Sequence, residues 1–297
     1  MTPRTILAGD VGGTKTWLGL FDAGAPRPEP IETARYATLE FDGLAGVVAR
    51  FLDDAGAREA PEAACFGVAG PVRDGVSQLT NVPWTADARE IRERFGVASV
   101  HLLNDLEAMG WAVPRLAAHE LAVVHAGVPA AGGNAALIAP GTGLGETALH
   151  RVGARLVPMP SEGGHADFAA RTPRELEFAA AFAAERGRVS LEDVVSGPGL
   201  VNLHAFPHRG AACTGDPLPA RPGDRPAAVT AGALTGACTA CTEALRLFVA
   251  ALGAAAGNLA LRTVATAGVY IGGGIVPNLL PAVRTGGFVD AFLAKHP

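Results

Sequence analysis

A repeated unit of strand, glycine-rich turn and strand constrains the fold of this chain more than any other feature. The first copy spans residues 6–21, with its turn at residues 10–15. The second copy spans residues 135–150, with its turn at residues 140–145. Apolar runs separated by such turns are typical of β-hairpins. We therefore predict two similar halves, each opening with an antiparallel hairpin.

The remainder of the chain alternates helix and strand patterns. Further strands are expected at residues 64–69, 99–103 and 268–271, and helices at residues 43–56, 86–95, 173–186, 191–205, 229–262, 277–284 and 286–295. This alternation indicates an α/β fold with mostly parallel central strands. Residues 207–226 contain five prolines and three glycines, so we predict a surface loop or lid edge there, in preference to a linker between domains.

Composition excludes several classes of protein. The chain has 24 Lys and Arg against 29 Asp and Glu in 297 residues, a net charge of −5, so no nucleic-acid partner is expected. Hydrophobic residues make up 49%, enough for a large core and too many for a disordered chain. The uncharged stretches at residues 121–145 and 263–283 contain prolines and glycines that interrupt a membrane-spanning helix. The first residues lack the apolar stretch of a signal peptide, so we predict a cytoplasmic protein with no membrane partner.

The four cysteines, at positions 65, 213, 238 and 241, are too few for a disulfide framework. Cys238 and Cys241 have the CxxC spacing of many metal sites, but no second Cys/His pair at metal-site spacing accompanies them in the sequence. We therefore expect inert thiols that are buried or half-buried.

Neither glycine turn matches a phosphate-binding loop that opens a helix. The pattern that starts at Gly9 has Thr14 where a P-loop needs its second glycine, and Gly143 is followed by Glu146 where a dinucleotide-binding turn needs glycine. Backbone N–H groups of the glycines and the hydroxyls of Thr14 and Thr142 remain suited to an anion. A tight structural hairpin is the alternative for one turn alone, and the occurrence of two turns at equivalent positions weakens it.

Six short segments occur in an order that points to a family. Residues 10–14 (DVGGT), 141–143 (GTG) and 272–274 (GGG) resemble the two phosphate motifs and the adenosine motif of sugar kinases with the actin/hexokinase-like fold. Residues 104–107 (NDLE), 162–165 (EGGH) and 196–200 (SGPGL) are similar to signatures of the bacterial ATP-dependent glucokinases. The resemblance covers nearly the whole chain.

The resemblance implies a fold class. It is α/β, with two actin/hexokinase-like (ribonuclease H-like) domains whose mixed sheets are flanked by helices, and with the active-site cleft between the domains. The expected domains are a small N-terminal one at residues 1–112 and a large one at residues 113–297. Few residues follow Gly274, whereas the family continues through a helix, one more strand and a final helix. We therefore expect the C-terminal strand and helix of the family to be missing.

ATP and Mg²⁺ are the cofactors that the resemblance implies. The expected ATP-binding residues lie in the three glycine-rich motifs: Gly9, Asp10, Val11, Gly12, Gly13, Thr14, Gly141, Thr142, Gly143, Gly273 and Gly274. Asp10 has the charge needed to hold Mg²⁺, which keeps most of its water, so contact through water is expected. Lys15 stands where the bacterial ATP-dependent glucokinases often have Asn. Its side chain is expected either to neutralise phosphate or to be solvated.

Asp105 is the candidate general base for phosphoryl transfer. It follows the strand pattern that ends at Leu103 and begins a helix-like segment, which in α/β folds is the strand end that faces the crevice. From position alone, a helix N-cap is an equal alternative. The resemblance favours the base.

Contacts to glucose are assigned by the resemblance to Asn104, Asp105, Glu162, His165 and Glu192. Asn104 offers a donor and acceptors suited to neighbouring sugar hydroxyls. Two glycines separate Glu162 from His165, so this loop can bring both side chains to one ligand. The Cys-rich zinc motif of the related repressor/kinase superfamily is absent near this loop, so no structural zinc is expected.

Together these expectations describe ATP-dependent phosphorylation of glucose at its 6-hydroxyl to glucose 6-phosphate, the first step of glycolysis. The alternatives are a kinase of the same fold that acts on mannose or an N-acetylated aminosugar or uses polyphosphate, and a non-catalytic sugar-sensing regulator. No helix-turn-helix pattern precedes Ile6, and Asp105 occupies the base position, which both weigh against the regulator. A homodimer is implied by the resemblance alone.

Overall fold

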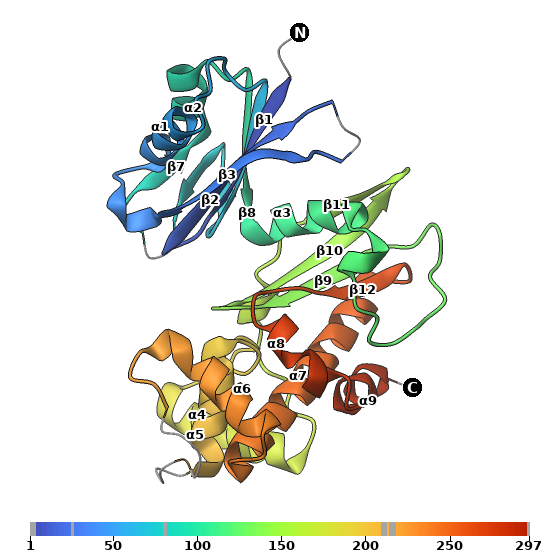
Figure 1. The fold of residues 1–297 in the computed structure, drawn as a ribbon. Helices are drawn as coiled ribbons and strands as arrows, with labels where there is room; N and C mark the ends of the chain where they lie inside the picture. The colour runs from blue at the N-terminus through green and yellow to red at the C-terminus, as the bar shows by residue number, and fades with distance from the viewer. Residues whose placement is uncertain (1–3, 25–26, 80–81, 209–212, 214–217, 296–297) are drawn as a thin grey trace. The chain divides into compact units, whose positions relative to one another are not determined.

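Figure 1 shows the computed structural model, which describes residues 4–24, 27–79, 82–208, 213 and 218–295. The chain divides into two compact units, unit 1 at Met1–Arg115 and unit 2 at Leu116–Pro297. Each unit has its own sheet and its own buried apolar cluster.

Unit 1 is built on a five-stranded sheet in the order β3-β2-β1-β4-β8. Its strands are β1 (Thr5–Val11), β2 (Lys15–Asp22), β3 (Pro30–Ala37), β4 (Ala63–Val68) and β8 (Ser99–Asn104). β1, β2 and β3 pair antiparallel, whereas β1, β4 and β8 pair parallel. The carboxyl ends of β1, β4 and β8 therefore meet at one edge of the sheet, where side chains from three strands can act together.

Three helices and a small sheet complete unit 1. The helices are α1 (Leu44–Asp54), α2 (Ala88–Phe95) and α3 (Asp105–Ala112), and the small sheet comprises β5 (Val72–Arg73), β6 (Val76–Gln78) and β7 (Thr85–Asp87). α1 turns Val47, Val48 and Phe51 into the core at helical spacing, and all three are fully buried.

The sheet of unit 2 has the order β11-β10-β9-β12, with β9 (Ala135–Pro140), β10 (Leu144–Val152), β11 (Arg155–Met159) and β12 (Gly268–Ile271). β9 pairs antiparallel with β10 and parallel with β12, as β1 does with β2 and β4. Every residue of β9 is buried, because it lies at the centre of the sheet with neighbours on both sides. Among the described residues, this sheet has one strand fewer than that of unit 1.

Helices form the larger part of unit 2: α4 (Pro173–Arg186), α5 (Gly197–His208), α6 (Arg225–Leu234), α7 (Thr239–Thr263), α8 (Val276–Val283) and α9 (Gly287–Leu293). α7 is long and apolar enough to span a membrane, but 72% of its most apolar stretch is buried inside the protein. Gly253 and Gly257 lie against the backbone of α9, at the carbonyls of Phe288 and Phe292. The apolar sequence of α7 therefore belongs to the core helix of unit 2.

The structure confirms both hairpins, as β1–β2 and β9–β10, and the helix at residues 173–186. The helix expected at residues 229–262 is wrong, because the chain breaks between α6 and α7 at Gly236, whose φ of 69° lies in the left-handed region. The helix expected from residue 191 begins only at Gly197. The prediction missed β3, β11 and the small sheet.

Residues 207–226 were expected to lack regular structure, and this is wrong at both ends. His208 ends α5, a 3₁₀ turn covers Pro222–Asp224, and α6 begins at Arg225. Residues 209–212 and 214–217 of this segment lie outside the described part of the chain.

Candidate active site

The first glycine turn, between β1 and β2, is held from behind by Thr38. The Thr38 hydroxyl donates to the carbonyl of Gly12 at 2.8 Å, and its backbone N–H donates to the carbonyl of Thr14 at 3.2 Å. The hydroxyl of Thr16 lies 3.0 Å from that of Thr38, and both residues are fully buried. Because Thr14 and Lys15 stay exposed, the turn is fixed on its protein side and open to a ligand on the other.

Three of the residues expected to bind ATP, Gly9, Asp10 and Val11, lie in β1 itself. The side chain of Val11 is fully buried, so only its backbone is available to a ligand. A Cβ atom on Gly9 would lie 2.6 Å from side-chain atoms of both Leu18 and Phe66. The glycine at position 9 is thus required by packing, whatever it binds.

Asp10 and Asp105 lie at the edge where the parallel strands of unit 1 end. Asp10 is the penultimate residue of β1, and Asp105 is the first residue of α3, directly after β8. Although solvent reaches both carboxylates, surrounding protein atoms remove part of their hydration, which raises the pKa of each. The negative charge of Asp105 raises the pKa of Asp10 further, so the two groups lie close enough to repel each other.

Asn104 is the N-cap residue of α3. Its Oδ1 accepts hydrogen bonds from the N–H groups of Leu106 at 3.0 Å and Glu107 at 3.4 Å, and its Nδ2 donates to the carbonyl of Gly70 at 3.4 Å. The N-cap alternative for Asp105 is therefore wrong. The Asp105 Oδ1 accepts from Leu106 N–H at 2.8 Å, which opposes the rise in its pKa and fixes the orientation of the carboxylate.

The second glycine turn joins β9 to β10 in unit 2, and two other motifs pack against it. Gly141 N–H donates to Gly143 O at 2.8 Å, and Gly141 O accepts from Gly197 N–H, the first residue of α5, at 2.8 Å. Gly273 has a φ of 89°, and a Cβ there would collide with the carbonyl of Pro140. The segments at residues 141–143, 197–199 and 272–274 therefore meet at the end of β9.

Glu192 connects this turn to the loop that carries Glu162 and His165. Its Oε2 accepts from Leu144 N–H at 2.7 Å, and a Cβ on Gly143 would lie 2.5 Å from the same oxygen. Its backbone N–H donates to Gly164 O at 2.9 Å. One carboxylate oxygen of Glu192 thus orders the glycine turn, a role that the sequence did not suggest.

Glu162 precedes a single 3₁₀ turn, Gly163–His165, and His165 is its last residue. Their side chains are 75% and 64% exposed, and Glu162 Oε2 lies 3.8 Å from His165 Nε2. A Cβ on Gly164 would collide with Leu144 O, so the loop lies directly on the start of β10. Unit 2 thereby brings Glu162, His165 and Glu192 to one region and leaves the first two accessible.

Sequence reasoning missed Glu146, a carboxylate beneath this loop. It is 1% exposed, its Oε2 accepts from Arg262 at 3.1 Å, and a Cβ on Gly163 would collide with the same oxygen. Its Oε1 has no hydrogen-bond partner among the described residues. Burial raises the pKa of Glu146, and the charge of Arg262 opposes the rise. The available signal was an acidic residue inside an apolar strand.

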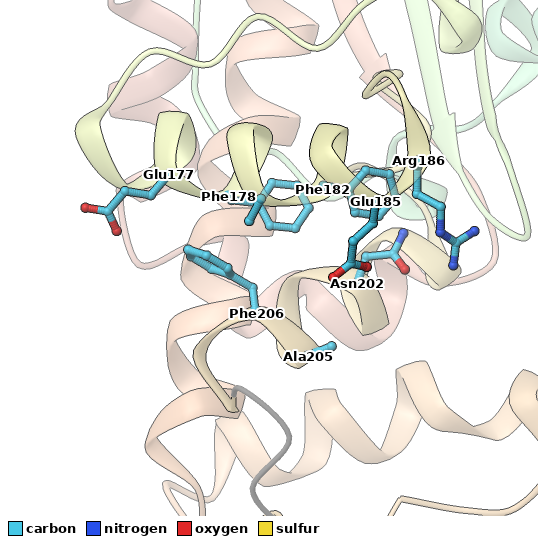
Figure 2. Close-up of a pocket in the computed structure, with 9 residues that line it drawn as sticks. Glu177, Phe178, Phe182, Glu185, Arg186, Asn202, Ala205 and Phe206 are labelled. Atoms are coloured by element: carbon cyan, nitrogen blue, oxygen red, sulfur yellow. The ribbon is translucent and has the colours of Figure 1, made fainter.

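Unit 2 has two hollows that most of the predicted site residues do not line. One, of about 720 Å³, lies between α4 and α5, and Figure 2 shows Phe178, Phe182 and Phe206 along it. None of the predicted site residues lines it. The other, of about 790 Å³, follows β12 and reaches Gly272 and Gly273 of the third glycine motif.

All four cysteines are free and buried or half-buried, as expected, but three of them are not isolated. Cys213, Cys238 and Cys241 lie together with His204 and His208, with one ligand atom of each within 4.8 Å of the others. His204 and His208, at HxxxH spacing on α5, form the second pair that was expected to be absent. Cys65 lies apart, in β4 of unit 1.

Comparison with known proteins identifies the family. The family model described as Glucokinase matches residues 7–297. The glucokinase of Aromatoleum aromaticum is 40% identical over 281 residues, which cover 93% of this chain and 81% of that protein. The glucokinase of Mesorhizobium japonicum is 36% identical over 98% of this chain and 83% of its own length.

Solved structures agree with the sequence comparison. The glucokinase from an Antarctic psychrotroph superposes with a TM-score of 0.85 at 32% identity, covering 98% of this chain and 89% of that one. A ROK family glucokinase from Streptomyces griseus, solved with glucose and AMPPNP, shares the fold with a TM-score of 0.65 at 20% identity, over 99% and 92% of the two chains. The α/β architecture is thus that of the actin-like sugar kinases, and the chain belongs to the glucokinase family.

Proposed function

We propose that this chain transfers the γ-phosphoryl group of ATP to the 6-hydroxyl of glucose, giving glucose 6-phosphate and ADP. Membership of the glucokinase family supports this reaction. The observation that carries it is the position of Asp105. Its carboxylate begins α3 at the carboxyl edge of the parallel strands, is oriented by Leu106 N–H and stays open to solvent.

Asp105 is proposed as the general base. As the 6-hydroxyl oxygen bonds to the γ-phosphorus, the proton of that hydroxyl passes to the Asp105 carboxylate and the bond between the γ-phosphorus and the bridging oxygen breaks, releasing ADP. Desolvation raises the pKa of Asp105, which makes its carboxylate a better proton acceptor. The group must be ionised to act.

Asn104, Glu162, His165 and Glu192 are proposed to bind the sugar hydroxyls. The Asn104 amide lies beside the Asp105 carboxylate and opposes the rise that desolvation causes in its pKa, and Glu162 and His165 are exposed at their loop. Glu192 still has an oxygen besides the one that accepts from Leu144 N–H. A sugar with one hydroxyl inverted would leave such a group unpaired, at a cost of about 1–3 kcal/mol.

The ATP phosphates are proposed to bind the glycine turns at residues 12–14 and 141–143, and the adenosine to bind Gly273 and Gly274. The bracing of the first turn by Thr38 and of the second by Glu192 supports this, because it fixes backbone N–H groups in advance. The N-terminus of α5 adds a favourable dipole beside Gly141.

A magnesium ion fits the carboxylate edge of unit 1. Asp10 and Asp105 repel each other there, and a divalent cation relieves such repulsion. Asp10 would hold the ion, through water, and the ion would supply positive charge to the β- and γ-phosphates. We further propose a cytoplasmic homodimer, on the resemblance alone, which sedimentation velocity would test.

The decisive test is ADP release by the full chain with a panel of sugars and with ATP or polyphosphate as donor. Turnover of glucose with ATP supports the proposal. Turnover confined to mannose, to an N-acetylated aminosugar or to polyphosphate would identify another kinase of the same fold. Glucose binding without any turnover would identify a regulator.

Asp105→Asn tests the base. We expect kcat to fall by about 10²–10⁴-fold with glucose affinity retained, because the amide cannot accept the proton. Asp42→Asn, which changes an exposed acid elsewhere in unit 1, serves as the matched control and should keep full activity. Near-normal turnover of Asp105→Asn would place the base elsewhere.

A further inference from the structure

Five metal-ligating side chains of unit 2, none of them among the residues proposed for phosphoryl transfer, lie together. They are His204, His208, Cys213, Cys238 and Cys241, which we call the Cys/His cluster. One ligand atom from each lies within 4.8 Å of all the others. Thiolate sulfur and imidazole nitrogen are the donors of structural zinc sites, whereas Mg²⁺ prefers oxygen.

The side chains of the Cys/His cluster come from α5, from the start of α7 and from Cys213 between these two helices. His204 and His208 are four residues apart and therefore share one face of α5, with ring centroids 4.2 Å apart. Asn202 and Phe206 lie on another face and line the hollow toward α4 (Figure 2). At the other end of the segment, Cys238 is the N-cap of α7 and Cys241 lies in its first turn.

The side chains of the Cys/His cluster are largely buried, and without a ligand their polar atoms lower the stability of the fold. Cys238 and Cys241 are each 1% exposed and His204 is 5% exposed. The Nε2 atom of His204 has no hydrogen-bond partner among the described residues. Leaving a buried polar atom unpaired costs about 1–3 kcal/mol, so such an atom next to three thiols points to a missing partner.

Two interatomic distances match the edges of a tetrahedral zinc site. Cys213 Sγ lies 3.6 Å from Cys241 Sγ, and Cys238 Sγ lies 3.5 Å from His208 Nε2. Zinc bonds of about 2.3 Å to sulfur and 2.0–2.1 Å to nitrogen place tetrahedral neighbours about 3.8 Å apart for two sulfurs and about 3.6 Å apart for sulfur and nitrogen. A disulfide needs about 2.05 Å between sulfurs, so Cys213 and Cys241 are not joined as such.

We propose that the Cys/His cluster binds one structural Zn²⁺ through the thiolates of Cys213, Cys238 and Cys241 and one imidazole of the His204/His208 pair. These two distances share no atom, so together they define four corners of a tetrahedron, with His208 as the nitrogen ligand. His204 Nε2, which has no hydrogen-bond partner among the described residues, can take the nitrogen position instead. The ion ties the end of α5 to the start of α7 and takes no part in the proposed phosphoryl transfer.

This site differs from the zinc motif whose absence was noted at the loop of residues 162–165. The absent motif belongs near that loop, whereas the Cys/His cluster is formed by residues of α5 and α7 and by Cys213 between them. The expectation of no structural zinc rested on that loop and on the CxxC pair considered without the two histidines of α5.

The first experiment measures metal in the full chain, purified with a reductant and desalted after incubation with one equivalent of ZnCl₂. We expect about one zinc ion per chain by elemental analysis. Replacement by Co²⁺ should give the strong visible bands and sulfur-to-cobalt charge transfer of tetrahedral thiolate coordination. Less than about a tenth of an ion per chain, or the weak bands of octahedral cobalt, would overturn the proposal.

Variants then locate the ion. Cys238→Ser/Cys241→Ser should lose at least about nine-tenths of the bound zinc, because only three ligands remain. Cys65→Ser, the matched control in unit 1, should keep all of it. His204→Ala and His208→Ala should each retain zinc, and the two together should lose it. Equal zinc in the double cysteine variant and the unchanged chain would show adventitious binding and overturn the assignment.

A measurement on the unchanged chain covers the case in which the cysteine variant fails to fold. With zinc bound, a thiol reagent should modify only Cys65 rapidly, and a zinc chelator should make Cys213, Cys238 and Cys241 reactive and lower the melting temperature. Modification at the same rate with and without chelator would mean that the thiols are simply buried together, and the proposal would fail.

Discussion

At the scale of single residues, the candidate site depends on groups that are held by partners far along the chain. Asp105 was predictable from its position after a strand pattern, because parallel strands end at one edge. Thr38 and Glu146 were not, since their partners Gly12 and Arg262 lie 26 and 116 residues away. Local patterns carry no information on such pairs.

The raised pKa of Asp105 predicts a particular pH dependence of stability. Because the folded pKa lies above the ordinary value of about 3.9, the folded chain keeps a proton that the unfolded chain has lost. Stability therefore falls as pH rises from about 4 through the folded pKa. Asp105→Asn removes this component, so its free energy of unfolding relative to the unchanged chain should rise between pH 4 and pH 7.

Urea unfolding of both proteins at the two pH values checks this. A difference between the two free energies that stays constant or shrinks as pH rises would show that Asp105 is not destabilised by ionisation. The same variant should lose about 10²–10⁴-fold in kcat, so a residue that the reaction needs would lower the stability of the fold.

Thr38→Val tests the bracing of the first glycine turn. The substitution keeps the shape of the side chain but removes the hydroxyl that serves Gly12 and Thr16, so we expect a loss of about 1–3 kcal/mol in unfolding free energy. The KM for ATP should rise as the turn loosens. Thr33→Val, at an exposed position of β3, is the control. An unchanged KM for ATP would separate Thr38 from the phosphate turn.

At the scale of elements, hairpins were predicted well and helix ends poorly. The β1–β2 and β9–β10 hairpins follow from adjacent residues, whereas the break between α6 and α7 depends on one backbone angle at Gly236. The apolar pattern runs on across the break, so periodicity alone predicts one helix. β11 was missed because buried and exposed residues do not alternate regularly along it.

Gly236→Ala tests that break. An alanine at a φ of 69° should cost about 1–2 kcal/mol, because Cβ disfavours the left-handed region. Gly223→Ala has open space around it and no left-handed φ, and it should cost little. Thermal unfolding of both variants gives the comparison. Equal melting temperatures would mean that the break does not depend on glycine.

At the scale of the whole molecule, the sequence predicted two similar halves, and both sheets show the same order around their central strands. The sequence did not predict the Cys/His cluster. Its members lie on α5, at Cys213 and at the start of α7, and only the packing of unit 2 brings these parts of the chain together.

Glucose should stabilise the chain through both units. At a glucose concentration of 100 times Kd, we expect about 2.7 kcal/mol of added unfolding free energy. Asn104→Ser in unit 1 keeps a capping oxygen but removes the amide, and Glu162→Gln in unit 2 removes a charge. Each should reduce the glucose-induced shift in melting temperature while leaving the sugar-free value nearly unchanged. A full shift in either variant would remove that residue from the sugar site.

The 25 residues of α7 have a consequence for how the protein is made. Their composition would suit a membrane-spanning helix, and only the packing of unit 2 hides them. Before α5, α6 and α9 are in place, the new chain presents a long apolar stretch to every chaperone and insertion factor that it meets. α9 follows α7 in the sequence, so this stretch cannot be fully covered until α9 has been synthesised. We therefore expect yield in cells to depend on chaperone capacity more than on the stability of the finished fold.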